Sequence, residues 1–577
     1  MNGKITRLCL THNWRPQELL LFVVLIAAGL TLLWSGLSIR SLWGSEGRWA
    51  VIVKEMLQSG NYFLPTINGT VYFDKPLLSY WAILPFVKLG GLTESMLRMP
   101  ATLAGLGTAM SIFFMGRRLF GARAGFFAAI LLLTSPMFLL WGRTASAELL
   151  NTLAIWVMLT AILAARSQNR FRNLLLFYCA GAVGSFLKGP VAPAVVLCAI
   201  LIYGTWGTFD ELRRSGFAYR TLKASVFKEF FWLLSGPGMA GLLLGAGLFC
   251  FLLFLPVLLT GSWTSVLLMW KENVVRFFSP FDHRDPAYSY IGHIMLFCAP
   301  WTFLVLASIW QARYWETGNT RRWTLGSALG ILLFFLISGS RRGYYILPLI
   351  PALALITGKA LDDWVANARG STSRVMDRAA LATTALLILL SGALFYVYLF
   401  MPAYRHGSEI LVGVIVAVGA ILAGILLAVK KNRLNALSVL FLLVFIISLW
   451  GFTQGMKIGE RERGLRDFAR QASKEIDKAG QDAVALYREG NAILIFYLNR
   501  ASAIKYVHSI ADINSFREKY PKGLLLVDVN EIPSDTRDYF QRLIPLIHQT
   551  GSDNQREERF TVMKFPDGGK EGERERR

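Results

Sequence analysis

Charged residues are scarce in this chain of 577 residues. Asp, Glu, Lys and Arg make up 17% of the sequence, whereas soluble globular proteins carry about 25%. Hydrophobic residues account for 54%, so the chain has too few polar side chains to cover a folded surface of this size. This composition excludes a soluble enzyme, a disordered protein and a fibrous protein, and it indicates a polytopic membrane protein.

Cysteine is also scarce. The sequence holds 5 cysteines, no pair has CxxC or metal-ligand spacing, and none follows Cys298. All but Cys9 lie inside apolar runs. A disulfide framework or a zinc site therefore has no support, and we expect the thiols to pack as small hydrophobic side chains.

Apolar runs of membrane-spanning length, about 20 residues, recur along the chain. The first, at 18–37, follows a basic N-terminal segment and has no small-residue cleavage site after it, so we predict a retained transmembrane helix. The further predicted crossings are 98–116, 124–141, 147–165, 173–187, 190–207, 232–260, 288–310, 323–338, 344–360, 379–401, 408–429 and 434–452. The sequence thus predicts an all-α polytopic membrane protein with about 13 transmembrane helices.

Basic residues gather in alternate loops. The net charge of +23 could indicate nucleic acid as a partner, but every loop predicted on the inner side carries at least three Lys or Arg residues. The positive-inside rule then places the N-terminus in the cytoplasm and the C-terminus outside, and the inner loops contact anionic membrane lipids. The alternation holds only if 77–92, which contains a Pro and a Lys, is an interfacial helix on the outer surface. Nucleic acid is not needed to explain the charge.

Two outer stretches are long enough to have structure of their own. In the first, 38–97, apolar residues recur at helical spacing after Glu46. In the second, the segments DAVALY, GLLLVDV and RFTVMKF read as strands and alternate with the helical segments INSFREKY and TRDYFQRLIPLIHQ. We therefore predict a transmembrane domain over 1–455, a small soluble α/β domain over 456–566 and a disordered charged tail over 567–577.

Polar clusters lie near the outer ends of the predicted helices, where charge is costly and usually functional. They are residues 45–48, 72–76, 143–148 and 340–345, together with Lys188 and His283. Carboxylates can act as a general base, and Arg and Lys can clamp a phosphate. Each cluster alone has a simpler explanation. Arg341 and Arg342 can anchor a helix end, Asp74 and Lys75 can form a surface ion pair, and His283 can be a solvated loop residue.

The motifs resemble a known family in their order. SEGRWA, VKEMLQSGNYFLPTINGTVYFDKPLLSYW, GRRLFG, GRTASAE, LKGP and SRRGYYILPLIPALA are similar to the motifs of bacterial GT-C glycosyltransferases. The nearest groups are the protein O-mannosyltransferases and the aminoarabinose–lipid A transferases, and the resemblance covers roughly residues 20–360. It implies an enzyme of the bacterial inner membrane that moves a hexose or pentose from an undecaprenyl-phosphate donor, with inversion. The acceptor, at the outer face, is a lipid A-like molecule, a protein or a glycan.

The resemblance also implies site residues. Glu46 and Glu148 are the expected catalytic carboxylates, and as a facing pair they are also candidate ligands for a divalent metal. The expected substrate-binding residues are Ser45, Arg48, Lys75, Arg143, Lys188, His283, Arg341, Arg342, Tyr344 and Tyr345. The sequence departs from the family twice, with Ser45 and Glu148 where the family has Asp. Serine is no base at neutral pH without help. The role of catalytic base therefore passes to Glu46 or to Glu148, or, if the acceptor is an anion, no residue needs to fill it.

Two other hypotheses stay open. A transporter or flippase of a lipid-linked substrate fits the glycines and prolines within the apolar runs, such as Gly236, Pro237 and Pro256. Against it, the charged residues gather at one face rather than at mid-membrane. A non-catalytic relative that only binds prenyl lipids fits the replacement at Ser45. The sequence leaves the sugar, the acceptor, the role of the C-terminal domain and the oligomeric state open.

Overall fold

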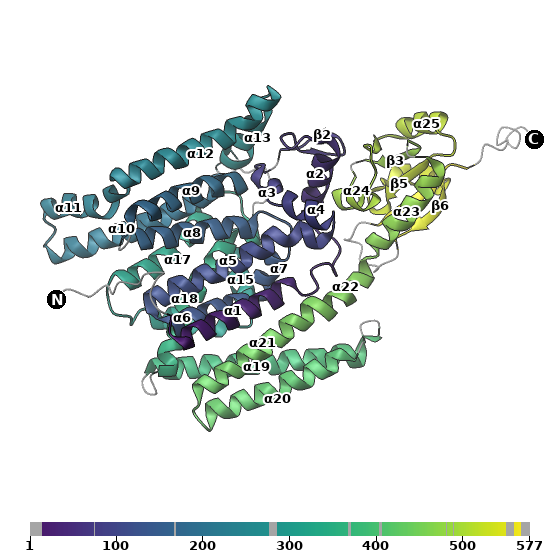
Figure 1. The fold of residues 1–577 in the computed structure, drawn as a ribbon. Coiled ribbons are helices and arrows are strands. Elements are labelled where there is room, and N and C mark those ends of the chain that lie inside the picture. Colours follow the sequence, from purple (N-terminus) through teal and green to yellow (C-terminus); the bar gives the residue numbers. More distant parts are fainter. Residues whose placement is uncertain are drawn as a thin grey trace, which may run out of the picture. The chain divides into compact units, whose positions relative to one another are not determined.

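The computed structural model describes residues 14–73, 75–166, 169–275, 278, 285–366, 371–402, 405, 407–480, 482–488, 490–549 and 559–566 (Figure 1). The chain divides into two compact units. The membrane unit comprises 1–37, 73–83 and 98–454, and the second unit comprises 38–72, 84–97 and 455–577. Most of the predicted first outer loop therefore belongs to the same unit as the C-terminal segment.

Long apolar helices make up the membrane unit. They are α1 (Pro16–Trp34), α5 (Glu94–Phe120), α6 (Ala122–Leu133), α7 (Pro136–Gly142), α8 (Glu148–Ala165), α9 (Arg170–Lys188), α10 (Val191–Arg214), α12 (Gly236–Thr260), α15 (Ser289–Phe297), α16 (Thr302–Ala312), α17 (Asn319–Ile337), α18 (Ile350–Ala366), α19 (Ser371–Phe400), α20 (Ser408–Ala428) and α21 (Arg433–Trp450). Shorter elements join them: α3 (Leu78–Trp81), α11 (Tyr219–Phe230), η1 (Phe231–Leu234), α13 (Thr264–Trp270), η2 (Lys271–Val275), η3 (Gly343–Leu349) and η5 (Gly451–Gly455).

The number of candidate spans is lower than the number of crossings that the sequence predicts. Among the described residues, 10 helices are long and apolar enough to cross a membrane, or up to 12 if each of two bent pairs makes one span. The pairs are α6–α7, bent by 71°, and α15–α16, bent by 109°. Of the 13 predicted crossings, 173–187 is the one without a matching candidate span. It forms α9, which is less apolar because Arg170, Arg172 and Lys188 lie near its ends. The polytopic helical fold itself is confirmed.

The helices of the membrane unit pack as neighbours in the chain and across it. In Figure 1, α9 lies between α8 and α12, and α19, α20 and α21 lie side by side. In addition, α10 packs against α17, and α18 packs against α6 and α16. The short helix α3 packs against α9. The 3₁₀ segment η3 contacts α8, α15, α17 and α18. It therefore brings the predicted polar cluster at 340–345 against α8, which begins in the cluster at 143–148.

The second unit begins with a helix that the sequence predicts. Helix α2 (Glu46–Ser59) buries Trp49, Ile52, Val53 and Met56, four of the five residues whose spacing predicts it, and leaves the fifth, Leu57, half-buried. Gly60 caps its C-terminus, with a φ of 70° that lies in the left-handed region that glycine favours. A short antiparallel hairpin follows, made of β1 (Thr66–Ile67) and β2 (Thr70–Val71), and then α4 (Leu84–Gly90). The predicted interfacial helix at 77–92 is thus divided into α3 and α4.

The C-terminal part of the second unit is a mixed sheet, as the prediction of an α/β domain requires. Its strands are β3 (Val484–Tyr487), β4 (Lys505–Val507), β5 (Leu524–Asp528), β6 (Ile544–His548) and β7 (Phe560–Lys564), in the order β4-β3-β5-β7-β6. β3 pairs in parallel with β4 and β5, and β7 pairs antiparallel with β5 and β6. The helices are α22 (Met456–Arg463), α23 (Leu465–Ala479), α24 (Ala492–Leu498), α25 (Ile510–Lys519), α26 (Arg537–Gln541) and the short η6 (Val529–Glu531) and η7 (Ser534–Thr536).

One segment of this domain differs from the prediction. The sequence predicts one helix for TRDYFQRLIPLIHQ, but α26 ends at Gln541 and residues Ile544–His548 form β6. Pro545 has no N–H group for a helix, and prolines in sheets occupy edge strands. β6 is such an edge strand in the sheet order, and its register shifts between Pro545 and Ile547. Pairing with β7 therefore decides the structure of this segment.

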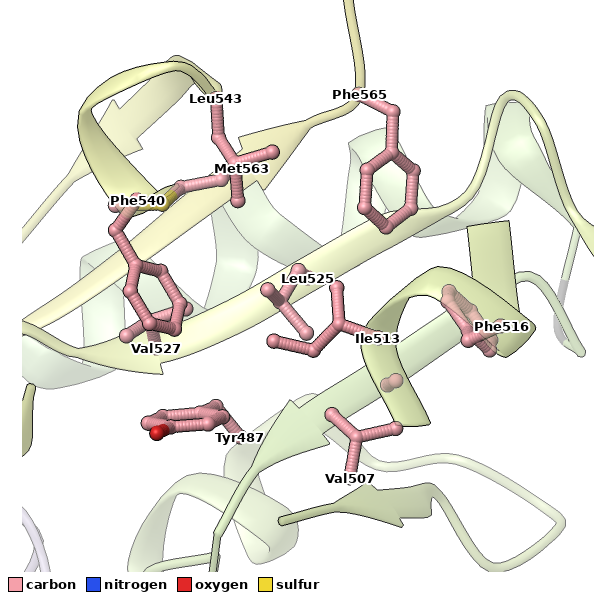
Figure 2. Close-up of a cluster of buried hydrophobic side chains, with 11 residues drawn as sticks. Tyr487, Val507, Ile513, Phe516, Leu525, Val527, Phe540, Leu543, Met563 and Phe565 are labelled. Atoms are coloured by element: carbon pink, nitrogen blue, oxygen red, sulfur yellow. The ribbon is translucent and has the colours of Figure 1, made fainter. Parts of the chain in front are cut away.

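The sheet and α25 enclose a hydrophobic core (Figure 2). Ile513 and Phe516 of α25 pack with Val507 and Leu525 of the strands, and all four side chains are fully buried. Ser509 begins α25 with a capping box, in which its hydroxyl accepts from Asp512 N and the Asp512 side chain accepts from Ser509 N. Hydrogen bonds to the Asp512 carboxyl from the backbone N–H of His508 and from Ser509 hold its pKa below the ordinary value.

Candidate functional site

An ion pair joins two of the predicted site residues in the membrane unit. Glu148 is the first residue of α8 and Lys188 is the last residue of α9. Lys188 Nζ lies 2.5 Å from Glu148 Oε2. Glu148 is only 8% exposed. A helix N-terminus favours an anion and a helix C-terminus favours a cation, so each charge lies at the helix end that stabilises it.

A glycine lets the two helices approach. A Cβ on Gly184 of α9 would lie 3.1 Å from Ala154 Cβ of α8 and 2.8 Å from Ala192 Cβ of α10. Real Cβ atoms essentially never approach other atoms within 3.0 Å. Gly184 precedes Lys188 by about one helical turn, so the close packing of α9 on α8 is what brings Lys188 to Glu148.

Aromatic residues of η3 surround the ammonium group of Lys188. Its Nζ lies 4.6 Å from the ring centroid of Tyr345 and 6.0 Å from that of Tyr344, within the range of cation–π attraction. Trp141, in α7, packs on Tyr344 with ring centroids 4.4 Å apart. Arg342 Nη1 donates to the hydroxyl of Tyr344 at 3.2 Å. Five predicted residues therefore gather at one place: Glu148, Lys188, Arg342, Tyr344 and Tyr345.

A histidine that the sequence analysis does not single out also borders this cluster. Helix α15 packs on η3, and a Cβ on Gly343 would lie 2.2 Å from His293 Nε2. His293 Nδ1 lies 2.7 Å from the carbonyl oxygen of Ser289. A proton on Nδ1 satisfies that contact and leaves Nε2 as a hydrogen-bond acceptor beside the SRRGYY motif. His293 is a lone histidine in an apolar run, so only the tertiary contact with Gly343 marks it.

Two of the arginines predicted to bind substrate contact main-chain carbonyls. The buried Arg143 donates to the carbonyl oxygens of Leu32 at 2.7 Å, Ser35 at 2.6 Å and Phe452 at 3.4 Å. It thereby connects α1 with the segment after α21. Arg341 donates to the carbonyl oxygens of Asp285 at 3.3 Å and Leu336 at 3.1 Å. These contacts favour a structural role for both residues, because carbonyls at helix ends need donors.

The SEGR motif lies at the start of α2 in the second unit. The Glu46 side chain is fully buried and accepts from Arg40 Nη2 at 3.4 Å and from the backbone N–H of Trp43 at 3.1 Å. Arg40 also lies over the Trp43 ring, 5.0 Å from its centroid. Neither partner is predicted from the sequence, since both precede the motif. The contacts fix the Glu46 carboxylate as an oriented anion.

The other members of this motif lie close by. Arg48 Nη1 donates to the hydroxyl of Tyr72 at 2.7 Å. Ser45 occupies the N-cap position of α2, but within the described part of the chain its side chain accepts no capping hydrogen bond from the helix. Arg48 is therefore directed at Tyr72, in the cluster at 72–76 that the sequence analysis also singles out.

The remaining predicted residues are spread over the chain. Lys75 is half-buried and lies just before α3, the helix that packs on α9. Asp74 and His283 lie outside the described residues. The predicted metal ligands Glu46 and Glu148 belong to different units. Where the structure describes the chain, no three His, Cys, Asp or Glu side chains gather as metal ligands.

A protein-family profile matches part of the membrane unit. The family profile described as dolichyl-phosphate-mannose-protein mannosyltransferase matches residues 74–222. This stretch contains Lys75, Arg143, Glu148 and Lys188. The match therefore includes the ion pair and most of the helices that position it.

Curated relatives extend the similarity. An undecaprenyl phosphate-alpha-4-amino-4-deoxy-L-arabinose arabinosyl transferase 2 of Pseudomonas fluorescens is 28% identical over 412 residues, which are 68% of this chain and 68% of the relative. Arabinosyl transferases with the same substrate name from Shewanella sediminis and Edwardsiella ictaluri are 24% and 27% identical. The matches cover 56% and 55% of this chain, and 57% and 55% of those relatives.

The fold is similar to a solved structure over most of its length. The crystal structure of ArnT from Cupriavidus metallidurans bound to undecaprenyl phosphate superposes with a TM-score of 0.68 at 20% sequence identity. The alignment covers 94% of this chain and 97% of that one. The structure of the same protein in the apo state gives a TM-score of 0.67. This likeness confirms the GT-C fold that the sequence predicts.

Proposed function

Because the chain belongs to the GT-C family of membrane glycosyltransferases that includes the protein mannosyltransferases and the ArnT enzymes, we propose that it transfers a sugar from undecaprenyl phosphate to an acceptor outside the cytoplasm. The Glu148–Lys188 pair, enclosed by Tyr344, Tyr345 and Arg342, is the observation that carries this proposal. It supplies one carboxylate and two cations to a single place.

Sugar transfer with inversion breaks the bond between the anomeric carbon and the phosphate oxygen of the donor. A nucleophilic oxygen of the acceptor forms the new bond from the opposite face, and polyprenyl phosphate leaves with the bonding electron pair. Lys188 stabilises the negative charge that develops on this phosphate, and a fixed cation does so strongly in a site with little water. Arg342, which already contacts Tyr344, offers further donors for phosphate oxygens.

The proposed role of Glu148 follows from its partner. When the donor phosphate binds Lys188, it competes with Glu148 for the same ammonium group. The displaced carboxylate then orients the acceptor and takes its proton as the new bond forms. Glu46 is held by Arg40 and the Trp43 amide, so we assign it an orienting role. Ser45 needs no catalytic function in this scheme.

The proposed orientation rests on charge. The basic loops face the cytoplasm, which places the second unit on the extracytoplasmic side of the inner membrane. The donor's sugar is taken to be a pentose, because the curated relatives that we compare are named as arabinosyl transferases. The acceptor can be a hydroxyl or a phosphate. Whether transfer needs Glu148 distinguishes these two classes.

The test is sugar transfer by the purified protein. The donor is undecaprenyl phosphate-4-amino-4-deoxy-L-arabinose, and mass spectrometry identifies both products. We expect Lys188→Met to reduce kcat by about a hundredfold or more, as for the loss of one transition-state donor. Lys228→Met is the matched control, because Lys228 also pairs with a glutamate, Glu211, at 3.4 Å but lies exposed.

Two outcomes would reject the proposal. A transporter of lipid-linked substrates would leave the donor chemically intact, so an unchanged mass in the presence of lipid A, peptide and glycan acceptors favours that class. Full turnover by Lys188→Met would remove the ion pair from the mechanism. Unchanged turnover by the Lys228→Met control is expected in either case.

A further inference from the structure

A cavity of about 260 Å³ lies in the second unit, formed by α2, the β1–β2 hairpin and the segment after α24. Its polar lining includes Lys54, Glu55, Gln58, Asn68, Arg500 and Ser502. The wall is built by contacts between distant parts of the chain. Asn68 Nδ2 donates to Ile504 O at 2.7 Å, and Ile504 N donates to Asn68 Oδ1 at 2.7 Å. These two hydrogen bonds clamp the hairpin to the loop that follows α24.

Lys54 lines this cavity from the middle of α2. It is 4% exposed, and among the residues that the structure describes it has no hydrogen bond and no ion pair. Lysines are almost never buried unless they are paired. Burial lowers the pKa of Lys54 to about 8, the Glu55 carboxylate acts to raise it, and Arg500 lowers it further. A buried ammonium group without a partner at a cavity wall is a site for an anion.

The neighbouring carboxylate is engaged elsewhere. Glu55 accepts from Thr66 Oγ1 at 2.5 Å, from Asn68 N at 2.7 Å and from Gly69 N at 3.2 Å. These bonds hold the turn of the hairpin. Glu55 therefore braces the cavity wall, and it leaves the charge of Lys54 available to a ligand.

The second cation of the cavity is held rigidly. Arg500 Nη1 lies 2.6 Å from Asp477 Oδ1, and its other nitrogens donate to the carbonyl oxygens of Leu498 at 3.0 Å and Ser473 at 3.3 Å. The side chain of Arg500 is 9% exposed. Two positive charges and the hydrogen-bonded carboxylate of Glu55 thus line one small space, together with the amide of Gln58 and the hydroxyl of Ser502.

We infer that this cavity binds a phosphomonoester group, with Lys54 Nζ as its principal cationic donor and Arg500, Gln58 and Ser502 around it. A phosphomonoester carries a charge of about −1.5 to −2 at pH 7. This charge matches two cations better than the charge of a ligand with a single carboxylate. Drug-sized ligands occupy clefts of roughly 300–1,000 Å³, so this smaller cavity encloses a phosphate and at most a small part of the group that carries it.

The two cations of this cavity and the Glu148–Lys188 pair lie in different units of the chain. Lys54 and Arg500 belong to the second unit, whereas Glu148 and Lys188 belong to the membrane unit. The inference does not rest on the proposed function, and the binding assay contains no donor lipid. The phosphate can come from a soluble phosphorylated compound or from a lipid headgroup, and the assay has one arm for each source.

The experiment uses isothermal titration calorimetry on the purified full-length chain in detergent. Inorganic phosphate is the probe in one arm, and mixed micelles that contain phosphatidic acid are the probe in the other. We expect at least one probe to bind the wild type, and Lys54→Met to weaken that binding at least tenfold. Lys54→Arg should retain it. Lys474→Met, which removes an exposed lysine of the same unit, should have no effect.

A second variant guards against misfolding. Gln58→Glu changes an exposed residue of the lining and places a carboxylate beside Lys54, so it should compete with phosphate and weaken binding as well. Phosphate binding that both Lys54→Met and Gln58→Glu leave unchanged would overturn the inference. So would the absence of binding by either probe to the folded wild type. Binding by phosphatidic acid but not by inorganic phosphate assigns the site to a lipid headgroup.

Discussion

Lys188 Nζ and Glu148 Oε2 lie 2.5 Å apart, although 40 positions separate the two residues in the sequence. The pair stands where α8 begins and α9 ends. Its consequence is chemical. A donor phosphate and Glu148 compete for one ammonium group, so donor binding and release of the carboxylate are coupled. Variants of these residues and of their supports therefore test both the mechanism and the packing that produces it.

Replacing Glu148 distinguishes the two acceptor classes. Glu148→Gln keeps the shape of the side chain but removes the base. We expect kcat to fall about a hundredfold or more if the acceptor is a hydroxyl, since general-base catalysis contributes 10²–10⁴-fold. A phosphate acceptor is already ionised near neutral pH, and its transfer should fall less than about tenfold. Steady-state assays with each acceptor measure the difference, and Glu211→Gln is the matched control.

Widening the contact between α8 and α9 should separate the ion pair. Gly184→Leu places a side chain where Ala154 and Ala192 leave no room, and overpacking costs roughly 1–3 kcal/mol. We expect a lower midpoint of thermal unfolding and reduced transfer. Gly247→Leu in α12 is the control, because a Cβ there meets nothing within 4 Å among the described atoms. Equal behaviour of the two variants would contradict this account of the packing.

Arg143 provides a test of structural against phosphate-binding roles. Arg143→Met removes three hydrogen bonds to carbonyl oxygens, and hydrogen bonds from charged donors contribute about 1.5–3 kcal/mol each. We expect a marked fall in the thermal unfolding midpoint, while the KM for the donor lipid in the remaining folded protein stays within about twofold. A large rise in that KM at unchanged stability would show that Arg143 binds the donor phosphate.

The stability of the second unit should depend on pH through Lys54. Its pKa is about 8 in the fold, below the ordinary 10.5, so the unfolded chain binds more protons between these values. The free energy of unfolding therefore rises with pH between about 8 and 10.5. Below about 8 Lys54 is charged in both states, and its burial then destabilises the fold fully. The charged groups that face Lys54 are Glu55 and Arg500.

Lys54→Met makes this dependence measurable. The variant removes a buried charge without a partner, so at pH 7 it should unfold at a higher temperature than the wild type. The difference should shrink as the pH approaches 10. A difference in unfolding temperature that stays constant from pH 7 to pH 10 would show that Lys54 titrates like an exposed lysine.

Some features of this protein follow from local sequence. Apolar runs of spanning length predict helices because a backbone in lipid must satisfy its own hydrogen bonds, and most predicted crossings coincide with helices. α2 follows from the spacing of Trp49, Ile52, Val53 and Met56. The motif order predicts the family, and the resemblance predicts Glu148, Lys188 and the tyrosines of η3 as site residues.

Other features depend on partners that the sequence does not place. Ile544–His548 forms a strand because β7 is available to pair with it. Arg143 carries the same charge as Lys188, but three carbonyl oxygens occupy its donors. His293 and Lys54 stand in ordinary helical patterns, and nothing in their neighbours along the chain distinguishes them.

The sequence by itself determined the membrane class, the helical architecture and the family, because each of these depends on the composition and order of short segments. The tertiary structure decided which charges are paired. Lys188 pairs with a carboxylate and Lys54 lines a cavity, although both are lysines in helices. The free energy of a buried charge depends on the atoms within a few ångströms of it, and for both lysines those atoms come largely from distant parts of the chain.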